Sequence, residues 1–488
     1  MSTWKRNTNT SFNRRGHQRG GLGSSVPGMP WRRKSDAIPR PPSPVLGPLL
    51  ATVGRPDLAI EPQAKPGNEK AHIEDCQLVA SYNWLNSTVP TILVPGMPPA
   101  WAPLPEPVKL QEDQGQYFRD QNAARYSSHP MQPAVEAILA QTPDFQSKSI
   151  DIVGCGSTLG NLLRFARNVD LNAKYRIFVE VVGSTVFFLR RVNQPTETIP
   201  DVRGFGHTFP EAYTSWDWDV KGSESHQRLI KYKFAGLSCL VRFESDGYLP
   251  DLAPKGLTVA AKSKAGESDV GRDVIAALQS TTVSERSPVS KESLTVHKRG
   301  QVVPQAAVFD LKTRSIFRKG TDFLEQELPR LWISQTPNFV LAFHRSGLFE
   351  EIEILDTRAR VNKWEEEQED NLLRYASLLR MLTSFALGHP DGRFEIFHEA
   401  ESAILELREV EDNVPRVLPG HLKDRWAMQD EESANLLDEE AEEASSERDI
   451  ESNWGRFDDE WQSDSEGSSK DYTACSASDC GYCGRCRY

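Results

Sequence analysis

Hydrophobic and polar positions alternate in ways that predict both strands and helices along the middle of the chain. Residues 175–182 (YRIFVEVV) and 185–191 (TVFFLRR) are two β-rich runs joined by Gly183-Ser184. A two-residue connection of this kind predicts a tight antiparallel hairpin. Five apolar residues further on recur at helical spacing and predict an amphipathic helix: Leu372, Ala376, Leu379, Leu382 and Ala386.

Residues 151–166 (DIVGCGSTLGNLLRFA) predict a strand that turns into a helix through a glycine-rich turn. The same pattern begins the phosphate loop of dinucleotide-binding and methyltransferase domains. Such domains continue as a parallel βαβ unit, with an acidic residue at the end of the second strand. Here an antiparallel hairpin follows, and Glu180 lies inside its first strand. We therefore expect a structural strand–turn–helix that binds no dinucleotide.

Composition limits how much of the 488-residue chain can form a core. Hydrophobic residues make up 38% of the chain, and Gly and Pro number 32 each. Globular proteins average roughly 45–50% apolar residues with Gly included, so we expect one large domain with disordered flanks. No apolar run approaches the roughly 20 residues of a membrane span, and the N-terminal segment lacks the hydrophobic stretch of a secretory signal. These features predict a soluble, intracellular protein.

The flanks differ in charge. Residues 1–35 hold eight Lys or Arg and no acid, and a Pro-rich stretch follows, so residues 1–73 are predicted to be a disordered basic arm and linker. Residues 74–410 form the expected core. An acidic disordered tail is predicted over 411–470, in which residues 430–466 carry sixteen Asp or Glu against two Arg. The basic arm suits RNA phosphates, and a solvated tail with no specific partner is the equal alternative. Its Gly and Pro content makes a mitochondrial presequence the weaker alternative.

A Cys-rich tail is predicted at residues 471–488, with the spacing C-x4-C-x2-C-x2-C. In a chain with intracellular features this spacing favours thiolate metal binding over disulfides. Four thiolates suit tetrahedral Zn²⁺; iron–sulfur ligation and free thiols are the alternatives. The four candidate ligands of a structural metal are Cys475, Cys480, Cys483 and Cys486.

Two central strand-like segments carry charges where an apolar run ends. They read CLVRFESD (239–246) and AAVFDLKT (306–313). Residues two apart share one face of a strand, so Glu244 with Asp246, and Asp310 with Lys312, are predicted to point the same way. Carboxylates bind Mg²⁺ or Mn²⁺, which can activate water beside a phosphate, and a lysine can orient that water. The pattern is typical of PD-(D/E)XK nucleases.

The order of these motifs along the chain resembles the decapping exoribonuclease family, whose members remove aberrant 5′ ends from RNA. The resemblance runs from about Ser81 to Thr357. In this chain Arg125-Tyr126 matches the family's Leu-Arg-Tyr signature, and GCGSTLGNLL stands at the place of a W-R-G-H-L-T-K-L-L-like segment. GFGHTFPEAY resembles the family's G-Y-K-F-E helix start. RFESDG corresponds to the family's G-E-x-D, and FDLKT to its E-L-K-T. The ending LPRLWISQTPNFVLAFHRSGLFEEIEIL follows the family's W-x-Q and P-N pattern.

The resemblance implies an α+β fold: a PD-(D/E)XK nuclease-like mixed sheet flanked by helices, with disordered N- and C-terminal extensions. It implies Mg²⁺ or Mn²⁺ ligands at Glu211, Glu244, Asp246 and Asp310, with Glu224 as the alternative to Glu211. Lys312, Gln335 and Glu244 are the implied catalytic residues. The chain departs from the family at Gly154-Cys155-Gly156, where the W-R-G arginine is missing, and in a predicted disordered insertion at 250–300.

Two functions follow from these motifs as expectations. The first is a divalent-metal-dependent phosphodiester or pyrophosphate hydrolase that acts on RNA 5′ ends. The second, based on the missing arginine and the insertion, is a non-catalytic RNA-binding or scaffold protein on a degenerate nuclease fold. An isoprenoid synthase is strongly disfavoured, because it needs an all-helical core and two Asp-rich D-D-x-x-D helices and the sequence shows neither. The expected location is nuclear or cytoplasmic.

Overall fold

The computed structural model describes residues 42–58, 71–199, 202–254, 293–411 and 413–427. All of these described residues belong to one compact unit. The predicted basic arm (up to residue 41), most of the predicted insertion, the acidic stretch 430–466 and the four tail cysteines lie outside the described residues.

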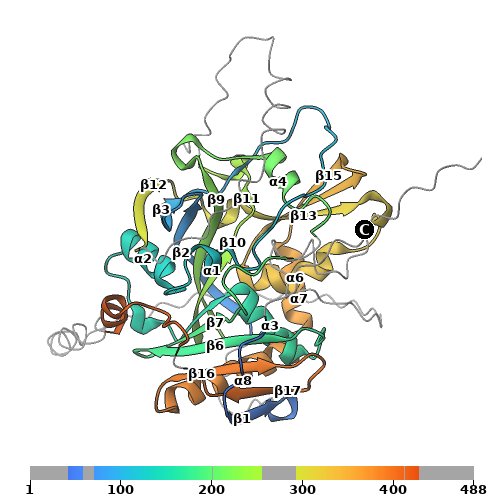
Figure 1. The fold of residues 1–488 in the computed structure, drawn as a ribbon. Helices are drawn as coiled ribbons and strands as arrows, with labels where there is room; N and C mark the ends of the chain where they lie inside the picture. The colour runs from blue at the N-terminus through green and yellow to red at the C-terminus, as the bar shows by residue number, and fades with distance from the viewer. Residues whose placement is uncertain (1–41, 59–70, 200–201, 255–292, 412, 428–488) are drawn as a thin grey trace, which may run out of the picture. The chain divides into compact units, whose positions relative to one another are not determined.

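The larger of two sheets in the described residues is mixed and has eleven strands (Figure 1). In spatial order they are β1 (Leu49–Gly54), β17 (Ile404–Arg408), β16 (Arg393–His398), β6 (Tyr175–Val182), β7 (Thr185–Arg190), β5 (Ile152–Cys155), β10 (Leu237–Glu244), β9 (Ser223–Phe234), β2 (Ile73–Leu85), β3 (Thr91–Gly96) and β12 (Thr295–Gly300). β5 pairs in parallel with both β7 and β10, and β12 with β3; the other neighbours are antiparallel.

A second sheet of six strands carries the acid–x–Lys segment. Its order is β15 (Leu348–Asp356), β14 (Asn338–Arg345), β13 (Val308–Ser315), β11 (Gly247–Tyr248), β4 (Ala100–Trp101) and β8 (Thr214–Ser215). β13 is antiparallel to β11 and parallel to β14. A parallel pair needs a crossover, and here it is the helix α6 (Phe323–Ser334).

The remaining helices of the described residues are α1 (Gln121–Arg125), α2 (Gln132–Gln141), α3 (Gly156–Arg167), α4 (Thr208–Tyr213), α7 (Arg358–Glu367) and α8 (Glu369–Gly388). The five apolar residues that predicted the helix at 372–386 are all buried in α8. The strand–turn–helix at 151–166 is confirmed as β5 followed by α3, and the hairpin as β6 and β7, where Gly183 has a φ of 60°. The predicted α+β class, with a mixed sheet flanked by helices, is confirmed.

The larger sheet is covered on both faces. Side chains of successive strand residues point to opposite faces, and neighbours such as Phe187 and Phe188 belong to different hydrophobic clusters. One cluster includes residues of α3, α6 and α8, and the other includes α2 and residues 417–426. This double cover explains why the strands read as nearly continuous hydrophobic runs.

The folded region is longer than the sequence predicts. β1 lies before residue 74 and pairs with β17, and β12 lies inside the predicted insertion. Residues 413–427, expected to belong to the disordered tail, pack against the core, with Trp426 3% exposed. The buried carboxylate of Glu180 accepts a hydrogen bond from the Val417 N–H (2.9 Å). A few well-placed apolar residues thus hold segments whose overall composition is polar.

Candidate functional site

The predicted carboxylates meet where the chain passes from the larger sheet to the smaller one. Glu244 is the last residue of β10, and Asp246 lies between β10 and β11. Because β11 pairs with β13, Asp246 is brought next to Asp310, and its Oδ2 accepts a hydrogen bond from the Leu311 N–H (2.7 Å). The predicted convergence of these two segments is therefore seen in the structure.

On β13 the side chains alternate between an apolar and a charged face. Phe309 and Leu311 pack in an apolar cluster with residues of β14 and α4. Asp310, Lys312 and Arg314 therefore face the other way, toward α6, whose residues Glu327 and Arg330 meet them. All three β13 charges are buried.

Arg330 binds Asp310 in a bidentate fashion. Its two terminal nitrogens donate to the two carboxylate oxygens, while its Nε donates to Glu327 Oε2 at 3.0 Å. Burial acts to lower the pKa of Arg330, but the charges of Asp310 and Glu327 outweigh it, so this pKa lies well above its usual value. The guanidinium is thus a permanent positive charge at the carboxylate pair.

The neighbouring charges shift the two other acids in opposite directions. Burial, and then the charge of Asp310, raise the pKa of Asp246 above its ordinary value. Burial also acts to raise the pKa of Glu327, but Lys312, Arg330 and Arg314 together bring it below its usual value. We call these six side chains the carboxylate–arginine cluster: Asp246, Asp310, Lys312, Arg314, Glu327 and Arg330.

The other predicted site residues are not members of this cluster, although Glu244 ends the strand that leads to Asp246. Glu244 is half-buried and accepts a hydrogen bond from Gln227 Nε2 (3.2 Å). Glu211 is exposed on α4, and Glu224 is paired with Arg125. Gln335 ends α6 in the left-handed conformation (φ 48°), and its side-chain amide donates to the Trp332 carbonyl (2.6 Å), so it is turned back onto its own helix.

These residues do not fit a divalent metal ion. A Mg²⁺ or Mn²⁺ site needs several free anionic oxygens, whereas both oxygens of Asp310 accept bonds from Arg330 and one oxygen of Asp246 accepts from the backbone. Within the described part of the chain, no three His, Cys, Asp or Glu side chains come together as a metal-binding group. The expected four-carboxylate site is not assembled in this structure.

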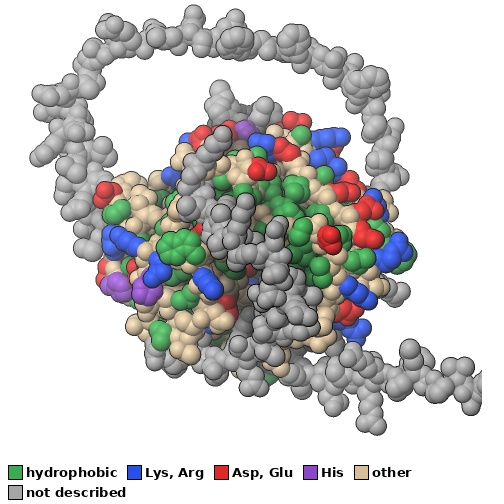
Figure 2. Space-filling model, turned by 90° about the horizontal axis from the view of Figure 1, so that it is seen from above, with side chains coloured by type: hydrophobic (Ala, Val, Ile, Leu, Met, Phe, Trp, Pro, Cys, Tyr) green, Lys and Arg blue, Asp and Glu red, His purple; other side chains and the backbone are tan. Residues whose placement is uncertain are grey.

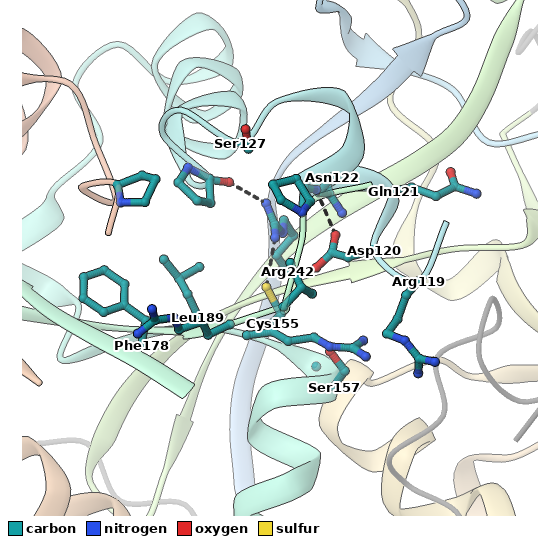
Figure 3. Close-up of a pocket in the computed structure, with 18 of the residues that line it drawn as sticks. Arg119, Asp120, Gln121, Asn122, Ser127, Cys155, Ser157, Phe178, Leu189 and Arg242 are labelled. Atoms are coloured by element: carbon teal, nitrogen blue, oxygen red, sulfur yellow. Dashed lines mark hydrogen bonds between the residues drawn. The ribbon is translucent and has the colours of Figure 1, made fainter. Parts of the chain in front are cut away.

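A cavity of about 490 Å³ opens beside the cluster. Glu244, Asp310 and Arg330 reach its wall, and Arg242 lies near the centre of the close-up in Figure 3. Arg242 Nη2 donates to Cys155 Sγ (3.0 Å) and Nη1 to the Pro130 carbonyl (3.0 Å). Arg242 is directly opposite Cys155 in the parallel β10–β5 pair. A guanidinium therefore lies beside the small residues that stand in place of the W-R-G arginine of the resembled family.

The first turn of α3 also lines this cavity. Cys155 is the N-cap of this twelve-residue helix, its side chain makes no capping hydrogen bond, and Gly156 and Ser157 follow it at the cavity wall. The first N–H groups of a helix have no partner within the helix and favour negative charge. Figure 3 shows Ser157 at the end of α3, with Phe178 and Leu189 on another side of the cavity.

Sequence reasoning missed Arg242, Arg330 and Glu327. Arg242 was visible in CLVRFESD, but its partner became clear only from the register of β10 against β5. Glu327 and Arg330 are three residues apart, a spacing that brings side chains together on a helix. Which face of α6 lies over β13 could not be predicted from that spacing.

No helix among the described residues combines the length and the apolar composition that a membrane crossing needs. On the face shown in Figure 2, acidic and basic side chains are interspersed around hydrophobic ones, and neither sign of charge dominates what is visible.

Comparison with solved structures finds similarity to Rai1 of S. pombe (11% identity, TM-score 0.46, covering 74% of this chain and 99% of that one). Rai1 of Candida albicans in complex with pU5-Mn²⁺ is similar at 11% identity and a TM-score of 0.45, covering 75% and 98%. Dxo1 of K. lactis in complex with manganese is similar at 10% identity and 0.40, covering 71% and 93%. These neighbours are decapping exoribonucleases. Such low identities and TM-scores do not transfer an activity or a substrate to this chain.

No curated protein matches the sequence at a significant level. One family model does match, over residues 60–425, which include the strand–turn–helix, both charged segments and α6. The match covers well over half of the chain, and the chain therefore belongs to the family described as Domain of unknown function (DUF8563).

Proposed function

We propose that the cavity beside Arg242 binds the 5′-phosphorylated end of an RNA strand. The observation that carries this proposal is the combination, in one cavity, of a buried guanidinium and an uncapped helix N-terminus. Both favour an anion, and an arginine presents several N–H donors in a geometry that suits phosphate oxygens.

The cavity also has the size and the apolar surface that a nucleotide requires. Ligand pockets in proteins range from roughly 300 to 1,000 Å³, and this one measures about 490 Å³. Phe178 and Leu189 line the wall together with several prolines. Phe178 is itself buried, with the Arg393 guanidinium over its ring, so it adds to the apolar wall that a base would contact and is not an open stacking face.

Burial of the guanidinium makes it a strong recognition element. Arg242 is 5% exposed, and the burial that acts to lower its pKa is outweighed by Cys155, Tyr82 and the nearby carboxylate of Asp120, which raise it. Its two bonds, to a thiol and to a carbonyl, involve no carboxylate. An incoming phosphate would therefore supply an anion bonded directly to the guanidinium, which these two bonds do not.

The test compares two five-nucleotide RNAs that differ only in a 5′-phosphate. We expect the phosphorylated RNA to bind more tightly in fluorescence anisotropy, and Arg242→Gln to weaken its binding about tenfold, which corresponds to the loss of one charge-assisted hydrogen-bond pair. Arg358→Gln, which removes an exposed arginine paired with Asp356, serves as the matched control. Equal affinity for the two RNAs in the unmodified protein would refute recognition of the 5′ end.

The second candidate function is hydrolysis of the bound RNA end. It is favoured by one observation, the convergence of Asp246, Asp310 and Lys312 next to the same cavity. Incubation with capped or triphosphorylated RNA, in parallel with Mn²⁺ and with a metal chelator, tests it. Release of the end that Asp310→Ala and Lys312→Ala both abolish would support hydrolysis, whereas unchanged turnover in both variants would assign the activity to another site or to a contaminant.

A further inference from the structure

The carboxylate–arginine cluster is balanced in formal charge. Three acids (Asp246, Asp310, Glu327) meet three bases (Lys312, Arg314, Arg330) between β13 and α6. Buried charges are tolerated when they are paired and hydrogen-bonded. With all six ionised the cluster is neutral, and with Asp246 protonated, which its pKa of about 8 favours at neutral pH, the cluster carries one positive charge. A divalent ion placed among them would add two more positive charges in either state.

The guanidinium of Arg330 lies beside the Asp310 carboxylate, in the place that a bound metal cation would occupy. Its planar guanidinium matches both oxygens of that carboxylate, and Glu327, one helical turn earlier, holds its Nε at 3.0 Å. The bond to Glu327 fixes the orientation of the guanidinium, and an arginine cannot lose its charge at any physiological pH. Arg330 is only 14% exposed as well, so little of it is screened by water.

We propose that Arg330 is the resident cation of this site and excludes divalent metal from it. It takes the oxygens that Mg²⁺ or Mn²⁺ would bind and supplies the positive charge that the carboxylates need. The cluster is then a metal-free version of an acid–x–Lys site. This inference goes beyond RNA binding and is independent of it, because metal binding is measured on the protein alone.

The first measurement uses the unaltered full-length chain. We expect isothermal titration of Mn²⁺ to give the same isotherm for the wild type and for Asp310→Asn, because Asp310 binds no metal in either. Weak binding by the acidic tail contributes equally to both proteins and cancels in this comparison. A saturable Mn²⁺ component that is present in the wild type and lost in Asp310→Asn would overturn the proposal.

The second measurement removes the guanidinium. Arg330→Gln leaves a carbonyl oxygen beside the two aspartates, and we expect it to gain a saturable Mn²⁺ component that disappears in Arg330→Gln/Asp310→Asn. Arg330→Lys keeps the charge and should stay metal-free. Arg360→Gln, which removes a half-buried arginine paired with two acids outside the cluster, is the matched control. A folded Arg330→Gln with the wild-type isotherm would contradict the proposal. If a thermal unfolding assay shows that Arg330→Gln does not fold, the comparison of the wild type with Asp310→Asn decides alone.

Discussion

His226 is buried on β9 between a neutral acceptor and a buried arginine. Its Nδ1 lies 2.6 Å from Asn83 Oδ1, and its Nε2 faces Arg228 Nη1 at 3.4 Å. This arrangement suits the neutral tautomer with the proton on Nδ1, which donates to Asn83 while Nε2 accepts from Arg228. Burial, and then the charge of Arg228, hold the pKa of His226 well below its usual value.

His226 should therefore make the protein less stable in mild acid. The unfolded chain takes up a proton near pH 6.5 and the folded chain does not, so the free energy of unfolding falls as pH drops below 6.5. At about 1.4 kcal/mol per pH unit, this one residue accounts for roughly 2 kcal/mol between pH 6.5 and 5. Urea unfolding at pH 7 and 5 should show a smaller loss in His226→Gln than in the wild type. Equal losses would mean that His226 is protonated in the folded protein.

For single residues of the candidate site, the sequence predicted some positions and not others. The convergence of Asp246, Asp310 and Lys312 was predictable because strand side chains alternate and the two segments end apolar runs. Gln335 was misplaced because the left-handed backbone at the end of α6 turns its amide toward Trp332. Arg330 was overlooked because a long side chain on a helix can reach several partners, and only the packing of α6 on β13 selects one.

Among the elements, the segment at 413–427 shows how far a few buried side chains extend a fold. Trp426 packs against the rings of Phe145 and Phe187, and its indole N–H donates to Thr185 Oγ1 (3.1 Å). Ser147 donates to the Trp426 carbonyl (2.6 Å). The segment reads as polar because its apolar residues are few, yet four of them are buried: Val417, Leu418, Leu422 and Trp426.

Removing this indole should cost a large fraction of the stability of the fold. Truncating a buried aromatic side chain to alanine costs about 3–5 kcal/mol of stability. We therefore expect Trp426→Ala to lower the free energy of unfolding by that amount. Trp218, which is 67% exposed, is the matched control, and Trp218→Ala should change stability by less than about 0.5 kcal/mol. Far-UV circular dichroism during urea unfolding measures both. Similar values for the two variants would show that residues 413–427 add little to the core.

Elements with a strong local signal were predictable, and elements defined by distant partners were not. The hairpin, β5 with α3, and α8 follow from periodicity and turn chemistry within some twenty residues. β1 and β12 are short and sit at the two edges of the larger sheet, where each pairs with one strand only. Their strand conformation depends on β17 and β3, which lie far away in the sequence or across the predicted insertion.

For the whole molecule, charge is distributed very unevenly along the chain. The formal net charge is −12, from 57 basic and 69 acidic residues, and residues 430–466 contribute sixteen of those acids against two Arg. Without that stretch the counts are 55 and 53, a formal charge of about +2. The acidic stretch has a charge density like that of a short oligonucleotide, and it should compete with RNA for basic surface.

Deleting residues 430–488 should therefore tighten RNA binding at low salt. The gain should shrink at higher salt, because the Debye length falls from about 10 Å at 0.1 M to about 3 Å at 1 M. Anisotropy titrations of both proteins at several salt concentrations measure it. The deletion also removes four cysteines, so Cys480→Ser/Cys483→Ser in the full chain is the control. Unchanged affinity in the deletion, or the same gain in the cysteine variant, would rule out the charge mechanism.

The pairing of β1 with β17 has a consequence for how the protein is made. Leu49 is joined to Arg408, about 360 residues later in the chain. At synthesis rates of roughly 5–20 residues per second, β1 leaves the ribosome roughly 20–70 s before its partner exists. During that time its backbone donors and acceptors have no native strand to pair with, and an unpaired edge is an aggregation hazard. Completion of the larger sheet must therefore follow synthesis of nearly the whole chain, and chaperones that hold nascent N-terminal segments should raise its yield.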